Sequence, residues 1–180
     1  MSDTNSALIA LVGVLAGGYL NNFLGEDFKR FRDGQALAGA LAGELASHAT
    51  GVPMLQTMLH SIVDTLKDEA ARIKLYEYLP PASPVFDASV SKLGLLGPAL
   101  AHEVAFVYEH IRAFRTLFRD MTIHYEDMSH ASMSGLCVHS LTLIDTVNSR
   151  GAKLIADLNS FAKDGYWRTR PWLSSLRKLG

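Results

Sequence analysis

The chain has 180 residues, which is enough for one domain of ordinary size and an additional segment. Hydrophobic residues make up 48% and charged residues 19%, and the formal net charge of −1 gives no general electrostatic reason to bind nucleic acid. A single cysteine, Cys137, excludes an intrachain disulfide and fits a reducing compartment. Its apolar neighbours in the sequence predict a small buried side chain.

The N-terminal stretch Ala7–Leu24 is apolar, and no charged residue occurs between Thr4 and Gly25. As a helix this stretch would be about 27 Å long, close to the hydrocarbon thickness of a bilayer. It also lacks the polar stripe of a surface helix. We therefore predict a single transmembrane helix within an anchor at residues 1–25. A buried core helix and a cleaved signal peptide are the alternatives, and the signal peptide is disfavoured because no Lys or Arg precedes the stretch.

Basic residues lie on one side of the predicted span only. Lys29, Arg30 and Arg32 follow it, which predicts that the N-terminus lies outside and the bulk of the chain in the cytoplasm. Gly13 and Gly17 are four residues apart, so both lie on one helix face where a second helix can approach closely. This spacing predicts a homodimer through the membrane helix. The alternative is that glycine is simply frequent in membrane helices.

Residues 26–165 predict a cytoplasmic helical bundle. An Ala-rich helix precedes Gly51 and Pro53, which mark its end and the start of the next helix. That next helix carries an apolar stripe from Leu55 to Tyr76. The segment "YLPPASP" then breaks it, because three prolines cannot continue a helix.

Three more helices follow the proline-rich break. Ser83 and Pro84 predict the start of a short helix that runs to Leu93 and stops at Gly94. Pro98 opens a longer helix. The apolar stripes of this helix and of the last one comprise Leu100, Val104, Val107, Tyr108, Ile111, Phe114, Phe118, Met121, Met133, Leu136, Cys137, Leu143, Ile144, Val147, Leu154, Ile155, Leu158 and Phe161. No β-type alternation appears, so we predict an all-α fold: a roughly four-helix antiparallel bundle after the membrane helix.

The segments "ALAGALAGEL" and "PVFDASVSKLGLLGPALAHEVAFVYEHI" resemble a group of uncharacterised bacterial proteins that pair an N-terminal membrane helix with a helical cytoplasmic region. The matching positions are Pro84, Val85, Phe86, Asp87, Ala88, Leu93–Leu96, Pro98, Leu100, Ala101, Glu103, Val104 and Tyr108. Gly97 departs from the proline that is more usual in that pattern. The resemblance covers roughly Ala36–Ile111 and implies a location at the bacterial inner membrane and a helical fold. It carries no catalytic residue.

Seven histidines raise the question of a metal site. Glu44 and His48 are four residues apart, and Glu103 and His110 are seven apart, so each pair shares a helix face. A di-iron bundle site needs two Glu-x-x-His pairs, and the chain has none. Signatures of a nucleophile elbow, a P-loop and a dinucleotide fold are also missing. We therefore predict no catalytic residue, metal or cofactor, and an enzyme is the less favoured alternative.

The C-terminal segment 166–180 is basic and contains both tryptophans of the chain. Its candidate contact residues are Trp167, Arg168, Arg170, Trp172, Arg177 and Lys178. Such a tail predicts contact with an anionic bilayer surface or with a protein partner, and the alternative is a packed or frayed end. Single-stranded nucleic acid is disfavoured because four basic residues form no wider patch.

Together these features predict a membrane-anchored helical binding or scaffold protein that is not an enzyme. Its expected partners are the lipid bilayer, a second copy through the membrane helix, and a protein that the sequence does not name, but no nucleic acid. Two alternatives stay open. One is a metal-binding or enzymatic bundle that uses histidines and carboxylates, and the other is a soluble helical interaction protein with residues 7–24 as a core helix.

Overall fold

The structure is a computed structural model that describes residues 2–68, 70, 72–75 and 81–166, with only the backbone described at 2–9, 16, 19 and 20. Its elements are α1 (Ser2–Thr50), α2 (Val52–Thr65), α3 (Pro84–Ser89), the 3₁₀ helix η1 (Val90–Leu96), α4 (Pro98–His124), the 3₁₀ helix η2 (Tyr125–Asp127) and α5 (His130–Lys163). All regular structure in these residues is helical, which confirms the predicted all-α class.

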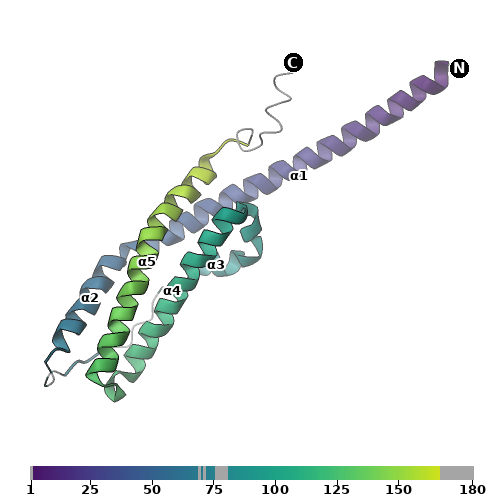
Figure 1. Cartoon of the computed structure of the whole chain (residues 1–180). Helices are drawn as coiled ribbons and strands as arrows, with labels where there is room; N and C mark the ends of the chain where they lie inside the picture. The colour runs from purple at the N-terminus through teal and green to yellow at the C-terminus, as the bar shows by residue number, and fades with distance from the viewer. Residues whose placement is uncertain (1, 69, 71, 76–80, 167–180) are drawn as a thin grey trace.

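Helix α1 is a single helix of 49 residues that runs through the predicted boundary at residue 25. No proline occurs before Pro53, and Gly25 alone does not interrupt a helix. The N-terminal half of α1 projects beyond the other helices (Figure 1). Among the described residues, no helix is both long enough and apolar enough to cross a bilayer. The single-pass anchor predicted at Ala7–Leu24 is thus not confirmed.

Helices α1 and α2 follow one another in the same direction, which differs from the predicted antiparallel pairing of neighbours (Figure 1). Gly51 joins them with helical backbone angles, φ −83° and ψ −15°, so the chain bends without reversing. Pro53 forces the break because it has no N–H for the carbonyl of Ala49. The bundle therefore consists of three columns: α1 followed by α2, then α4, and then α5. Helix α5 packs against α1, α2 and α4.

The buried residues of the bundle form two main clusters. The cluster nearer the projecting half of α1 comprises Leu37, Ala38, Leu41, Ala42, Leu45, Phe86, Leu96, Val104, Val107, Tyr108, Leu154 and Leu158. The cluster at the far end comprises Leu59, Ile62, Leu66, Phe114, Phe118, Met121, Met133, Cys137 and Ile144. The predicted stripes of α4 and α5 supply six of the nine residues of the far cluster and five of the twelve of the first, because residues three and four apart share one helix face. Cys137 is fully buried, as predicted.

The connection between α2 and α4 differs from the sequence prediction in two places. Helix α2 ends at Thr65 instead of continuing to Tyr76, and the carboxylate of Asp68 accepts the N–H of Ala70 at 2.9 Å in a local turn. The short helix does not stop at Gly94 but continues as η1 to Leu96. The chain turns at Gly97, where φ is +79° and glycine is favoured.

Candidate functional site

The projecting half of α1 exposes large apolar side chains. The exposed fractions are 59% for Leu11, 56% for Val12, 72% for Val14 and 63% for Leu15. Successive residues turn by about 100°, so these four side chains cover an arc of about 160° on one broad side of the helix. Residues 11–15 are therefore not packed into the core of their own chain, contrary to the core-helix alternative, whereas Leu24 at the end of the stretch packs against Phe31 and Tyr166.

Gly13 and Gly17 lie on this projecting part of α1. No described atom lies within 4 Å of the position that a Cβ atom would take at either glycine. None of the described residues thus obstructs the predicted dimer face. The predicted homodimer itself stays a prediction, since a single chain contains no second copy.

Tyr166, the last described residue, packs against α1 where its projecting half begins. Its ring makes edge contacts with Phe28 and Phe31, with centroids 5.2 and 5.3 Å apart. Its hydroxyl donates a 2.7 Å hydrogen bond to Oδ2 of Asp27. The C-terminal tail therefore begins beside residues 27–31 of α1. The predicted contact residues Trp167, Arg168, Arg170, Trp172, Arg177 and Lys178 lie outside the described residues.

A polar network joins α1, α3 and α4 beside the first core cluster. The carboxylate of Glu44 accepts the N–H groups of Val85 and Phe86 at 2.8 and 3.1 Å and the hydroxyl of Tyr108 at 2.8 Å. Glu44 therefore caps the first turn of α3. Burial and this carboxylate together raise the pKa of Tyr108, because both disfavour the phenolate. Ser83 holds the predicted N-cap position, but its side chain makes no cap hydrogen bond.

The hydroxyl of Ser83 instead joins a second cluster with Arg115 and His48. The guanidinium of Arg115 donates a 2.8 Å hydrogen bond to Ser83 Oγ, and Nε2 of His48 lies 3.1 Å from the same oxygen. The Ser83 hydroxyl donates to His48 Nε2 when the imidazole is protonated at Nδ1, and accepts from Nε2 in the other tautomer. Burial, and second the charge of Arg115, lower the pKa of His48, since both disfavour the imidazolium.

Arg115 is half-buried and makes no ion pair with any described carboxylate. The two acidic groups in its neighbourhood are engaged elsewhere. Glu44 caps α3, and Asp87 accepts from Arg112 at 3.3 Å. Burial lowers the pKa of Arg115, since removal from water disfavours its charge. A guanidinium in this position favours an anionic partner.

A partly open cavity of about 400 Å³ lies beside Arg115 and His48, at the bend between α1 and α2. Its walls are mostly apolar and come from α1, α2, α4 and α5, and it separates the two core clusters. Val107 and Ile155 line it from one cluster, and Phe114 and Ile144 from the other. Arg115 is the only residue of permanent charge among the described lining residues. This size and lining are those of a small-molecule site.

The floor of the cavity includes Gly151 of α5. This glycine is buried, yet no described atom lies within 4 Å of the position that its Cβ would take. A side chain at this position would therefore extend into empty space. Gly151 keeps the cavity open at a point where α5 would otherwise fill it.

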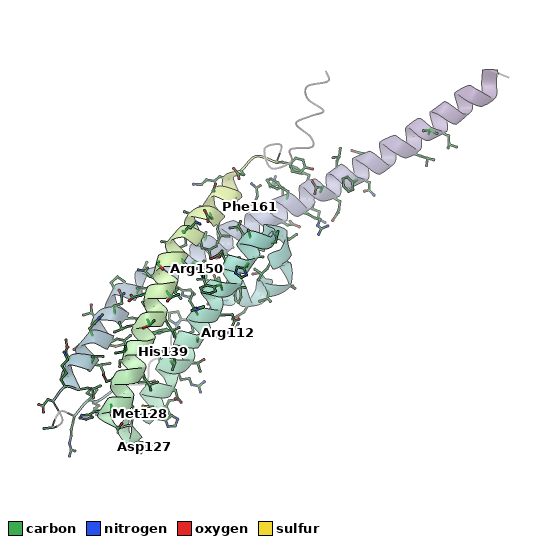
Figure 2. All side chains as sticks on the ribbon, in the orientation of Figure 1. Arg112, Asp127, Met128, His139, Arg150 and Phe161 are labelled. Atoms are coloured by element: carbon green, nitrogen blue, oxygen red, sulfur yellow. The ribbon has the colours of Figure 1, made fainter. Side chains whose placement is uncertain are left out.

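A separate ion pair joins α4 to α5. Arg150 donates to both oxygens of Glu103, with distances of 2.7 and 2.9 Å from Nη2, and its guanidinium lies 3.7 Å from the ring centroid of Phe106. Figure 2 shows Arg150 midway along α5, between Phe161 near the projecting half of α1 and Asp127 at the opposite end. The hydrogen bonds from Arg150 lower the pKa of Glu103. Glu103 thus stabilises helix packing.

The candidate metal ligands weighed from the sequence do not come together. No group of three or more His, Cys, Asp or Glu side chains among the described residues could hold a metal ion. Glu44 and His48 belong to neighbouring clusters but bind different partners. Comparisons of the chain with protein-family models, with curated proteins and with solved structures find no match.

Sequence reasoning noted Glu44, His48 and Ser83 but did not identify Arg115 or the cavity. Arg115 lies 67 positions from His48 and 32 from Ser83 in the chain. Only Gly51 and Pro53, which mark the bend, give a local signal of the space behind them.

Proposed function

We propose that this protein is a membrane-attached helical binding or scaffold protein that is not an enzyme. In this proposal the projecting half of α1 attaches the chain to a bilayer, and the bundle lies on the cytoplasmic side. The resemblance noted in the sequence favours the inner membrane of a bacterium as the location.

The observation that carries the proposal is the exposure of Leu11, Val12, Val14 and Leu15, four large apolar side chains close together on the projecting half of α1. Apolar area of this kind costs about 25 cal/mol per Å² in water. The absence of any charged residue between Thr4 and Gly25 also favours contact of this helix with lipid.

The surroundings of Tyr166 favour a position of the bilayer surface beside residues 27–32 of α1, directly after the apolar stretch. Lys29, Arg30 and Arg32 are exposed there, and the basic tail begins beside them. Two basic segments thus adjoin the same end of the apolar stretch. Lys and Arg next to a span favour the cytoplasmic side, and each contributes about 1 kcal/mol of attraction to anionic lipid.

Membrane partitioning tests the proposal. The full chain is expressed in a bacterial host, and the isolated membranes are washed with alkaline carbonate. We expect the protein to stay in the pellet and to be released by detergent. Recovery in the carbonate supernatant would contradict attachment through α1.

A matched pair of variants ties that result to the projecting helix. Val14→Asp introduces a charge into the apolar stretch, at a cost of about 3 kcal/mol in a bilayer, and should shift the chain to the supernatant. Val138→Asp makes the same change at an exposed valine of α5 and should leave the chain in the pellet. The exposed fraction is 52% for Val138 and 72% for Val14.

The proposal includes a second copy as partner, through Gly13 and Gly17. Replacing both glycines by leucine should abolish close approach of two helices, measured as loss of energy transfer between labelled chains in vesicles. Gly18→Leu is the control, because Gly18 is also open but points to a different side of α1. Unchanged energy transfer in the double variant would contradict this dimer face.

A further inference from the structure

The cavity at the α1–α2 bend combines apolar walls with one cation at its edge. We propose that it binds a free single-chain fatty acid, with the hydrocarbon chain inside the cavity and the carboxylate on Arg115. The inference concerns the bundle alone and does not depend on attachment to a membrane.

The charge of the site selects the head group. Arg115 has no ion pair with a described carboxylate, and no acidic residue is found among the described residues that line the cavity. A guanidinium matches the planar geometry of a carboxylate and binds it with charge-assisted hydrogen bonds. A single cation balances a monoanion, whereas a phosphate dianion would keep a buried excess of negative charge.

The neighbours of Arg115 hold it in position to bind such a head group. Its Nη2 donates to Ser83 Oγ at 2.8 Å and lies 3.4 Å from His48 Nε2. These bonds engage one terminal nitrogen of the fork, and no described carboxylate engages the others. Arg115 and His48 share the Ser83 hydroxyl, so the segment that carries Ser83 holds the guanidinium in place.

The shape of the cavity selects the tail. Its volume of about 400 Å³ is near the lower end of the range for small-molecule sites, too small for a two-chain phospholipid. The walls come from Val107, Ile111, Phe114, Ile144 and Ile155, which match a hydrocarbon chain. Gly151 leaves the floor open where the chain would lie.

Photo-crosslinking of the full chain tests the inference. The probe is dodecanoic acid that carries a diazirine in its hydrocarbon chain, and the labelled peptides are mapped by mass spectrometry. We expect labelling within residues 45–55 and 143–155, competed by unlabelled dodecanoate and not by dodecanol. Labelling confined to other peptides, or equal competition by the alcohol, would overturn the proposal.

Two variants test the tail and the head group separately. Gly151→Leu fills the cavity and should reduce labelling about tenfold, whereas Gly135→Leu, at an exposed glycine of the same helix, should not change it. Arg115→Met keeps the volume and should reduce labelling by the acid probe about tenfold, but not labelling by its methyl ester.

Two results would contradict the site. One is unchanged labelling in a folded Gly151→Leu chain, and the other is equal loss of acid and ester labelling in Arg115→Met. Thermal unfolding of each variant establishes that it is folded. If Gly151→Leu does not fold, the proposal is tested by Arg115→Met alone, through labelling by the acid probe compared with labelling by its methyl ester.

Discussion

The hydroxyl of Tyr108 donates a 2.8 Å hydrogen bond to the carboxylate of Glu44, 64 positions earlier in the chain. The same carboxylate accepts the N–H groups of Val85 and Phe86. One side chain of α1 therefore holds both the start of α3 and the middle of α4. This relationship fixes the segment that carries Ser83 beside the cavity.

Removal of the Glu44 carboxylate should destabilise the bundle strongly. Glu44→Ala leaves two backbone N–H groups and the Tyr108 hydroxyl without their acceptor, at a cost of about 3 kcal/mol in the free energy of unfolding. Glu44→Gln retains one acceptor oxygen and should cost about half as much. Urea denaturation measures both, with Glu26→Ala at an exposed residue of α1 as control. Equal stability of Glu44→Ala and Glu26→Ala would refute this role.

Gly34 and Gly43 of α1 should respond oppositely to the same substitution. A Cβ at Gly34 would lie 2.9 Å from the carbonyl oxygen of Leu95, so Gly34→Ala should push η1 away and cost about 2 kcal/mol. Gly43 is exposed and has open space, so Gly43→Ala should stabilise the chain by about 0.8 kcal/mol through helix propensity. Thermal unfolding compares the two. A stabilising Gly34→Ala would show that η1 does not pack closely on α1.

The helices of this fold could be predicted from the sequence, but their arrangement could not. Apolar residues three and four apart indicate the buried faces of α4 and α5 by a local rule. The direction of α2 instead depends on whether Gly51 adopts helical or reversing angles, and both are open to glycine. Gly97 posed the same difficulty, because its positive φ depends on how η1 meets α4.

The site was harder to predict than the fold. The burial of Arg115 and the partners of its guanidinium depend on segments that are far away in the chain, such as the one that carries Ser83. The empty space beside Gly151 lies at the bend between α1 and α2, where the helices that line the cavity do not pack closely against one another. No local pattern of residues encodes such a space. The spacing of Glu44 and His48 indicated a shared face but not their different partners.

His48 should make the stability of the bundle depend on pH. Burial and the charge of Arg115 lower its pKa in the folded chain, below the ordinary value of 6.5, and Glu44 opposes this shift. Below pH 6.5 the unfolded chain therefore binds more protons than the folded chain. The contribution of His48 is fully present above that pH and is lost as the pH falls toward the pKa of the folded state.

Urea denaturation at several values between about pH 7 and about pH 5 measures this effect. The free energy of unfolding should decrease on acidification, and His48→Gln should flatten part of that decrease. The same substitution at exposed His139 serves as the control. If the wild-type chain and His48→Gln show the same pH dependence, protonation of His48 is not coupled to unfolding.

The C-terminal tail should bind anionic membranes by itself. A synthetic peptide of residues 166–180 contains Arg168, Arg170, Arg177 and Lys178 and no acidic residue. Each basic residue should contribute about 1 kcal/mol of attraction to phosphatidylserine vesicles, which is roughly fivefold in affinity. Replacing all four by glutamine should therefore abolish measurable binding, and higher salt should weaken the binding of the wild-type peptide. Tryptophan fluorescence follows the binding, with neutral vesicles as control. Equal affinity for neutral and anionic vesicles would mean that the aromatic residues, and not the basic ones, direct the tail to the surface.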